Sequence, residues 1–213
     1  MPRPKRPRWR RRKEARPAEI IAAALESFAE RGFAATRLED IAARAGVTRG
    51  TLYLYFPSKE ELFKAVVRQS IVPIIARGEA MVAHSHEPSA ELLRKLLLSI
   101  PMAVAGSPVS AIPKLVLSEA RNFPDLARFY LREVVRRGRR LLKAIIERGI
   151  ARGEFRAVDR DHVFFSVMSP LLLAMLWKHS LEPYDGKRLD VQALCRAHLD
   201  VLLNGLRKPE GSP

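Results

Sequence analysis

Cysteine is nearly absent from this sequence of 213 residues, in which Cys195 is the only one. A single cysteine excludes a disulfide within the chain and any metal site built from several thiolates. Such sparse use of cysteine is typical of proteins in a reducing compartment. We therefore expect a cytoplasmic protein.

Long hydrophobic runs are also missing. The most apolar stretch covers residues 163–177 and is interrupted by Ser166, Ser169 and Pro170. It is shorter than the roughly twenty residues that cross a bilayer as a helix. The N-terminus is cationic, but the apolar segment of a secretory signal does not follow it. The sequence therefore predicts no membrane segment.

Motifs of catalysis are absent as well. The sequence has no P-loop, nucleophile elbow or glycine-rich dinucleotide turn, and no acidic pair has a clear apolar setting. Of the five histidines, only His84 and His86 are close in sequence, and such a pair in a loop is a weak metal site. We predict that the protein is not an enzyme and needs no metal or cofactor.

Acidic residues are outnumbered, with 23 Asp and Glu against 38 Lys and Arg, which gives a net charge of +15. An excess of this size favours nucleic acid or another acidic partner. Residues 1–16 alone hold nine Lys or Arg and one Glu, together with three prolines. We expect this segment to be a disordered basic arm that contacts DNA phosphates or the minor groove. The alternative is a solvated tail that only raises nonspecific affinity.

The stretch from residue 36 to residue 62 has the pattern of two short helices and the start of a third. Thr36 and Glu39 predict a capping box for the first helix, which Gly46 ends. Thr48 is a suitable N-cap for the second helix, which runs for about two turns. The pattern therefore predicts two helices joined by a tight, glycine-bearing turn.

The second of these helices turns a polar, cationic and aromatic face outward. Its exposed residues include no carboxylate and are Arg49, Gly50, Thr51, Tyr53, Leu54 and Tyr55. After it, Ser58 and Glu61 predict a second capping box, which places Lys59 at the start of the next helix. This arrangement fits a helix-turn-helix whose second helix enters the major groove of DNA. Short capped helix pairs are also common in other all-α proteins, so these features alone leave both interpretations open.

The same stretch resembles a known family. From Thr36 to Leu62 the residues read T-x(4)-I-A-x(2)-A-G-V-T-x-G-T-x-Y-x-Y-F-x(2)-K-x(2)-L, without departure from the DNA-binding signature of the TetR family of bacterial regulators. The resemblance covers roughly residues 17–63. It implies an all-α fold in which a three-helix DNA-binding domain precedes a larger domain for effector binding and dimerisation.

The resemblance also implies DNA contacts. The positions that match the contact positions of the family are Thr36, Arg37, Thr48, Arg49, Gly50, Thr51, Tyr53, Tyr55 and Lys59. Arg49 is the best candidate for reading a base, because a guanidinium can donate two hydrogen bonds to guanine. The two tyrosines, Thr36 and Lys59 are expected to meet phosphates, which fix the register of a protein on DNA rather than its sequence preference.

Helical patterns continue to the C-terminus and predict about nine helices in total. The first helix covers residues 17–31 and completes the DNA-binding head. A long helix continues from Ser58 with a kink at Pro73, and another covers residues 124–152. We expect an arm at residues 1–16, a DNA-binding domain at 17–63, an effector-binding and dimerisation domain at 64–207 and a tail at 208–213.

Two helices near the C-terminus have too much apolar surface for a single chain to bury. Apolar side chains surround the helix at residues 159–181 on nearly every side, so it has no solvent face along most of its length. The last helix, at residues 189–206, also shows two apolar faces. We therefore predict a homodimer through these two helices, as the family resemblance also implies.

Large, adaptable side chains lie on helices that should surround the centre of the second domain. They are Met81, Met102, Phe123, Phe129, Tyr130, Phe164, Met168, Met175 and Trp177, with His162 and Ser166 as polar handles. Any one of them is more often part of a core than of a pocket. Together with the family resemblance they predict a pocket for a small, largely apolar or aromatic effector.

These features together predict a ligand-responsive transcriptional regulator that binds a near-palindromic operator in double-stranded DNA as a dimer. The family resemblance favours a repressor over an activator. An effector-independent, nucleoid-type DNA-binding protein is the alternative, and it would have a filled second domain and little sequence preference. An enzyme joined to a DNA-binding head is a third class. It would require a cluster of titratable residues in the second domain, which the sequence does not show.

Overall fold

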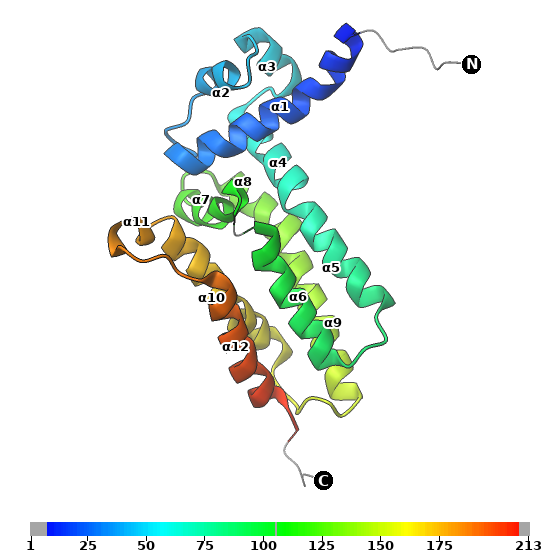
Figure 1. Ribbon diagram of the computed structural model, residues 1–213. Coiled ribbons are helices and arrows are strands. Elements are labelled where there is room, and N and C mark those ends of the chain that lie inside the picture. Colours follow the sequence, from blue (N-terminus) through cyan, green and yellow to red (C-terminus); the bar gives the residue numbers. More distant parts are fainter. Residues whose placement is uncertain (1–7, 105, 209–213) are drawn as a thin grey trace, which may run out of the picture. The chain divides into compact units, whose positions relative to one another are not determined.

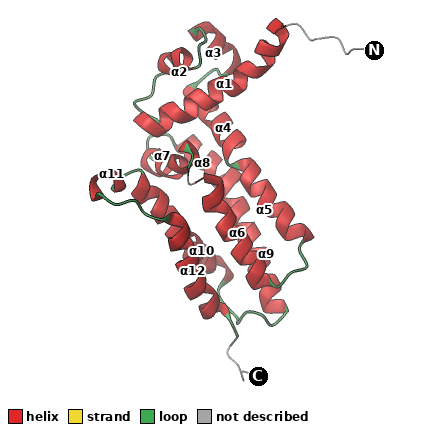
Figure 2. Cartoon of the chain, viewed as in Figure 1, coloured by secondary structure: helices red, strands yellow, loops and turns green. Residues whose placement is uncertain are grey.

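Helices joined by short loops make up nearly all of the described chain (Figure 1 and Figure 2). The computed structural model describes residues 8–104 and 106–208. Within these ranges the only β pairing is an isolated antiparallel bridge between Phe155 and Arg207. The chain divides into two compact units, Met1–Gln69 and Ser70–Pro213. The predicted all-α fold is confirmed.

The first unit is built from four helices around a small aromatic core. The helices are α1 (Arg8–Arg31), α2 (Leu38–Arg44), α3 (Arg49–Tyr55) and α4 (Lys59–Ser70). The rings of Phe28, Phe33 and Phe63 are almost completely buried, and their centroids lie 5.4 to 5.5 Å apart in tilted and edge-on pairs. Such aromatic contacts stabilise beyond the area they bury. They join α1, the turn after it and α4 into one core.

Helix α1 begins at Arg8, nine residues before the predicted start at Pro17. Residues 8–16 contain neither proline nor glycine, so nothing in their sequence ends a helix there. Pro17 therefore lies inside the helix, where it lacks one backbone N–H. The helix takes in residues 8–16 of the expected basic arm, and residues 1–7 of that arm lie outside the described residues.

The turn between α2 and α3 follows the predicted local rules. Gly46 has φ of 64°, which favours glycine, and the backbone N–H of Val47 donates to the carbonyl of Ala42 at 3.0 Å. Thr48 then caps α3, because its Oγ1 accepts a hydrogen bond from the backbone N–H of Thr51 at 3.2 Å. Both predicted helix boundaries are confirmed.

The capping box predicted at the start of α2 is wrong. Arg37 occupies the N-cap position, and its side chain makes no cap hydrogen bond. The Thr36 hydroxyl instead donates to the carbonyl of Gly32, and the Glu39 carboxylate lies beside Arg49. Each member of the predicted box has its partner on another element, a possibility that local spacing along the chain does not reveal.

The second unit contains the remaining helices. They are α5 (Val72–His84), α6 (Ser89–Val104), a 3₁₀ turn (Pro108–Ala111), α7 (Ile112–Glu119), α8 (Pro124–Tyr130), α9 (Arg136–Ala151), α10 (Arg160–Lys178), α11 (Glu182–Asp185) and α12 (Val191–Leu206). A π-helical turn, Leu131–Val135, joins α8 to α9 without a break. We call α8, this turn and α9 together the rod. If the rod is counted as one helix and the one-turn α11 is left out, the described chain has ten helices, against about nine expected.

Proline acts differently in two helices. At Pro73 the expected long helix is divided in two, because α4 ends at Ser70 and α5 starts at Val72 with Pro73 in its first turn. Pro101 is instead tolerated inside α6. None of the described helices is by itself long and apolar enough to cross a membrane, and α6 with residues 108–119 meets that test only as a pair bent by 105°.

The core of the second unit lies where α6, α9, α10 and α12 pack together (Figure 1). Leu92 of α6, Ile145 of α9 and Leu199 of α12 are completely or almost completely buried in it. Phe155, which follows α9, turns back into the same core against Gly149. A Cβ atom on Gly149 would overlap the Phe155 ring, so this close approach requires glycine.

Helices α10 and α12 keep large apolar side chains on their outer faces. In α10, Phe165 and Leu173 are 54% and 60% exposed, and Val201 of α12 is 73% exposed. The neighbouring Phe164 and Val167 point into the core. The single chain therefore covers only one side of α10, although its composition predicts a helix without a solvent face.

Candidate nucleic-acid interface

Most of the predicted DNA contacts lie at or near the surface of α3 and of the residues that precede α2 and α3. They are Arg37, Thr48, Arg49, Gly50, Thr51, Tyr53 and Tyr55. Leu52 is completely buried and anchors α3 in the core of the first unit. One buried side chain thus holds a short helix whose other residues are at least partly open to solvent.

Arg49 is an exposed basic residue of this surface and has contacts on two sides. One of its terminal amino groups, Nη1, lies 3.0 Å from Oε1 of Glu39, and its guanidinium carbon lies 5.4 Å from the centre of the Tyr53 ring. A hydrogen bond with Tyr53, and then the charge of Glu39, raise the pKa of Arg49 above its ordinary value. The side chain is therefore fully charged and restricted in position, although it remains mostly exposed.

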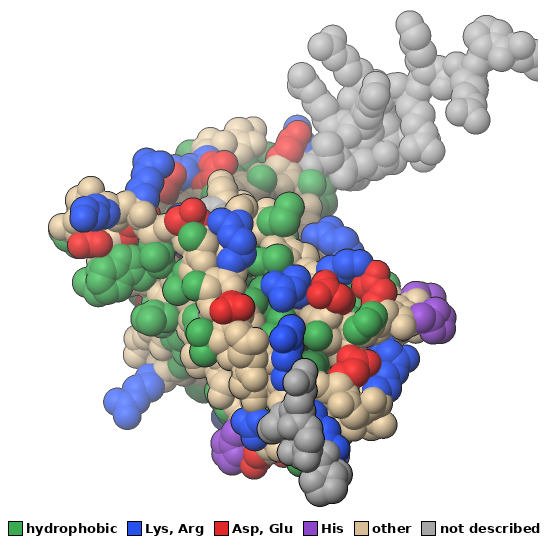
Figure 3. Space-filling view, turned by 60° about the horizontal axis from the view of Figure 1, so that its bottom comes forward, with side chains coloured by type: hydrophobic (Ala, Val, Ile, Leu, Met, Phe, Trp, Pro, Cys, Tyr) green, Lys and Arg blue, Asp and Glu red, His purple; other side chains and the backbone are tan. Residues whose placement is uncertain are grey.

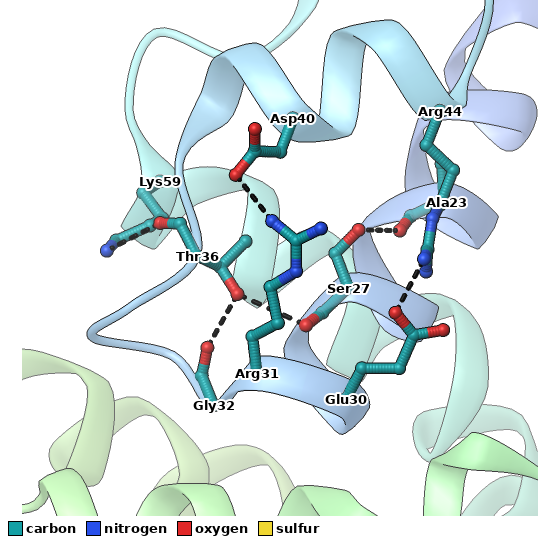
Figure 4. A network of polar contacts seen from close by, with 9 residues as sticks. All are labelled: Ala23, Ser27, Glu30, Arg31, Gly32, Thr36, Asp40, Arg44 and Lys59. Atoms are coloured by element: carbon teal, nitrogen blue, oxygen red, sulfur yellow. Dashed lines mark hydrogen bonds and ion pairs between the residues drawn. The ribbon is translucent and has the colours of Figure 1, made fainter.

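Thr36 does not belong to the exposed set, although it was expected to meet a phosphate. Its side chain is only 1% exposed. The hydroxyl donates to the carbonyl of Gly32 at 2.6 Å and lies 3.2 Å from the carbonyl of Ser27 (Figure 4). The hydroxyl of Thr36 is thus used inside the first unit, at the C-terminal end of α1.

Lys59 is likewise turned toward its own unit. Its ammonium donates to the carbonyls of Phe33, Ala34 and Thr36 at 2.9, 3.0 and 3.1 Å, and it lies 4.7 Å from the centre of the Phe33 ring. A lysine ammonium has three N–H groups, so these three carbonyls use all of its donors. In this conformation Lys59 ties the start of α4 to the turn between α1 and α2.

Ion pairs at the surface join α2 to α1 (Figure 4). Arg31 lies 2.8 Å from Asp40, and Arg44 lies 2.5 Å from Glu30. The hydrogen bond from Arg44 lowers the pKa of the Glu30 carboxyl below its ordinary value. Because these groups are exposed, each pair contributes little to folding stability. Their main effect is to match the charges of two adjacent helices.

Two residues of this surface were missed by the sequence-based site prediction. Leu54 is 75% exposed on α3 and could contact the methyl group of thymine. The sequence signal for Leu54 was present, since it belongs to the face of α3 predicted to be exposed. Glu39 gave no such signal, because its spacing from Thr36 indicated a cap.

The residues predicted to line an effector pocket are divided among several parts of the second unit. Phe164 belongs to the buried core, and Met81 and Met168 are partly buried against that core. Phe129 and Tyr130 lie next to the π-helical turn and are mostly buried, and burial raises the pKa of the Tyr130 phenol. Those that are half-buried elsewhere in the unit are Phe123, Met175 and Trp177.

Three of the predicted pocket residues face solvent in the single chain. Met102 is 73% exposed at the end of α6. His162 and Ser166 lie on the outer face of α10, where Nδ1 of His162 is 2.8 Å from Asp159. The two predicted polar handles are therefore not brought to the core residues Met81 and Phe164.

A serine and a histidine from distant parts of the second unit are in contact. Nε2 of His179 lies 2.8 Å from Oγ of Ser110, and the Ser110 hydroxyl donates to the carbonyl of Ser107 at 2.9 Å. Which of the two atoms donates depends on the tautomer of the histidine. Elsewhere in the described residues, no three His, Cys, Asp or Glu side chains could hold a metal ion.

Helix α3 follows a glycine turn, is anchored by one buried leucine and has a cationic and aromatic outer face. This is the arrangement of a helix-turn-helix DNA-binding protein. Residues 20–66 match the family described as bacterial regulatory proteins, tetR family. Residues 88–190 match the tetracyclin repressor-like C-terminal domain. The chain belongs to the TetR family, whose members bind DNA as dimers and respond to small molecules. It is therefore a DNA-binding transcriptional regulator.

Individual relatives agree with this assignment. The chain is 31% identical to the transcriptional regulator RutR of Escherichia coli over 162 residues, which are 70% of this chain and 68% of RutR. It is 28% identical to the solved structure of the ketosteroid transcriptional regulator KstR2 of Mycobacterium tuberculosis, with a TM-score of 0.72 over 91% of this chain and 95% of that one. The transcriptional regulator FadR of Bacillus subtilis, solved in complex with stearoyl-CoA, shares the fold; it is 24% identical, with a TM-score of 0.75 over 89% of this chain and 99% of that one.

Proposed function

We propose that this regulator is a repressor that binds a near-palindromic operator as a homodimer and leaves it when a small, largely apolar effector binds. DNA binding is assigned to the first unit, and dimerisation and effector binding to the second. The observation that carries the proposal is the exposed face of α3, where Arg49 stands beside Tyr53 and the helix has no carboxylate of its own. We expect the protein to act in the cytoplasm, where such a regulator meets chromosomal DNA.

Arg49 is assigned to a base, and its neighbours to the DNA backbone. A guanidinium that is restricted by two contacts can still donate two parallel hydrogen bonds to guanine in the major groove. Arg37, Thr48 and Tyr53 are exposed around it and are suited to phosphates. These roles predict that loss of Arg49 relaxes specificity at one base position and leaves the remaining preference intact.

The test begins with selection of tightly bound duplexes from a random pool by the wild-type protein. Arg49→Ala should reduce discrimination at one base pair of each half-site roughly tenfold or more. Arg31→Ala removes the same charge from the same unit at a residue paired with Asp40, and it serves as the control. If both variants weaken every duplex equally, Arg49 does not read a base.

The dimer is assigned to the outer faces of α10 and α12, where Phe165, Leu173 and Val201 are exposed. Leu173→Glu should convert the dimer into a monomer and abolish tight operator binding, because a dimer must place two recognition helices about 34–36 Å, or a multiple of one DNA turn, apart. Leu117→Glu on α7, which alters a leucine that is 55% exposed, is the matched control. Molar mass by light scattering reads the result. A dimeric Leu173→Glu protein would rule out this interface.

The effector is assigned to the interior of the second unit, where Phe164 is part of the buried core and Met81 and Met168 are partly buried against it. Apolar, adaptable side chains favour an apolar ligand. Similarity to a regulator named for ketosteroids supports the same class. The effector would favour a dimer geometry that no longer fits the operator. A panel of steroids, fatty acids and aromatic acids should therefore contain compounds that raise the melting temperature and release the selected duplex. Release without thermal stabilisation would argue against a site in this core.

A further inference from the structure

One carboxylate reaches the otherwise acid-free surface of α3. Helix α3 itself contains no acidic residue, but Oε1 of Glu39, in the first turn of α2, lies 3.0 Å from Nη1 of Arg49. Their side chains are 47% and 64% exposed. An ion pair this exposed contributes little to folding stability. Glu39 lies beside the proposed base-reading residue, so its contact with Arg49 is better explained by DNA binding than by folding.

The contacts of Arg49 divide its surface between two neighbours. Glu39 engages one amino group of the guanidinium, and the ring of Tyr53, one turn along α3, lies against it at 5.4 Å. A guanidinium has five N–H donors, so the contacts with Glu39 and Tyr53 leave enough for a bidentate bond with guanine. A side chain restricted in this way also loses less conformational freedom when it meets its base.

The charge of Glu39 has a second effect. A carboxylate at a DNA-binding surface is repelled by phosphates, and only its bond with Arg49 compensates for this repulsion. On a duplex where Arg49 is drawn away to a phosphate, Glu39 is left unpaired near negative charge. The charge of Glu39 therefore weakens binding to a mismatched site more than binding to a site where Arg49 stays beside Glu39 and reads its base.

We infer that Glu39 is a positioning and specificity-determining residue, which orients the guanidinium of Arg49 toward guanine and disfavours DNA that does not accept it there. This inference rests on the proposed reading of a base by Arg49. Specificity of this kind, in which a repulsive element acts against the wrong partner, differs from a gain in affinity for the right one. Removal of the charge should accordingly tighten binding to wrong sequences.

The experiment compares two variants that lose the same charge from the same helix. Glu39→Gln removes the partner of Arg49, whereas Asp40→Asn removes the partner of Arg31 at the adjacent position of α2. Dissociation constants are measured at one salt concentration for a duplex selected by the wild-type protein and for its scrambled version. A melting curve of each variant checks that it is folded.

Asp40→Asn should change both dissociation constants by the same factor and leave their ratio unaltered. Glu39→Gln should tighten binding to the scrambled duplex more than to the selected one, so that the ratio falls at least about fivefold, near the lower limit of what one bidentate base contact discriminates. An equal ratio in the two variants would overturn the inference. A wild-type protein that does not prefer its selected duplex would instead overturn the proposed function.

A double-mutant cycle separates an action through Arg49 from a general effect of charge. In an Arg49→Ala background, Glu39→Gln should no longer lower the ratio of the two dissociation constants, because there is no guanidinium left to orient. If Glu39→Gln lowers the ratio by the same factor with and without Arg49, Glu39 does not act by positioning that residue. A purely structural role would lower the melting temperature without moving the ratio.

Discussion

Replacement of Lys59 by methionine separates a structural role of this residue from a contact with DNA. Methionine keeps most of the apolar stem but removes the ammonium that donates to the carbonyls of Phe33, Ala34 and Thr36. It also removes the positive charge from the face of the Phe33 ring. The turn between α1 and α2 then loses its link to the start of α4.

The lost contacts determine how much folding stability the Lys59→Met variant loses. A hydrogen bond from a charged donor contributes about 1.5–3 kcal/mol when it is buried, and solvent reduces this value because the contacts of Lys59 are only partly buried. Allowing for that reduction, we expect the three bonds and the ring contact to stabilise the fold by about 2–3 kcal/mol. For a chain of this size the melting temperature should fall by roughly 5–10 °C.

Two measurements together test the reasoning. Thermal unfolding followed by circular dichroism should show the loss of stability. The slope of log K against log salt for the operator should stay the same, whereas loss of a phosphate contact lowers it by about 0.9 per subunit. Lys64→Met, which breaks only an ion pair with Glu61 on the same helix, is the control and should cost at most about 0.5 kcal/mol. A lower salt slope with unchanged stability would show that Lys59 binds phosphate.

Two further predictions concern the second unit. Gly149→Ala should destabilise the protein by about 1–3 kcal/mol in urea unfolding, because the new Cβ must displace the buried Phe155 ring, and an unchanged unfolding midpoint would contradict this packing. Burial, with the charges of nearby lysines, lowers the pKa of His179 below its ordinary 6.5, so the unfolded chain binds this proton more tightly than the folded one. Its contribution to stability is therefore complete above about pH 6.5 and declines below it, and His179→Gln should show a weaker loss of stability than wild type between pH 7 and pH 5.

Features that depend on near neighbours in the chain could be predicted from the sequence. Gly46 and Thr48 mark the turn of the helix-turn-helix because a left-handed residue and a hydroxyl cap act within a few positions. Pro124 marks the start of the rod for the same kind of reason, since its ring suits a first helical turn. The start of α1 was missed because Pro17 suits a first turn equally well, although here it lies inside the helix.

Partnerships between helices could not be predicted in this way. Lys59 meets the carbonyl of Phe33, which lies 26 residues earlier, and Glu39 of α2 meets Arg49 of α3. Both contacts depend on how the helices cross, which no spacing along the chain encodes. The same limit applies to His162 and Ser166, since their helix is apolar on nearly every side and its inner face could not be identified from periodicity. For this reason the exposed face of α3 was predicted better than the lining of the second unit.

The shortness of α3 affects how mutations of this protein must be interpreted. A helix of seven residues is not stable alone in water, so its position on the head depends on Leu52 in the core and on the turns around it. A substitution far from DNA can therefore weaken binding to every sequence, as the loss of a phosphate contact would. Salt dependence distinguishes the two causes, because only a lost phosphate contact lowers the slope. By this criterion Thr36 and Lys59 should behave as residues that position α3, and Arg37 should behave as one that contacts phosphate.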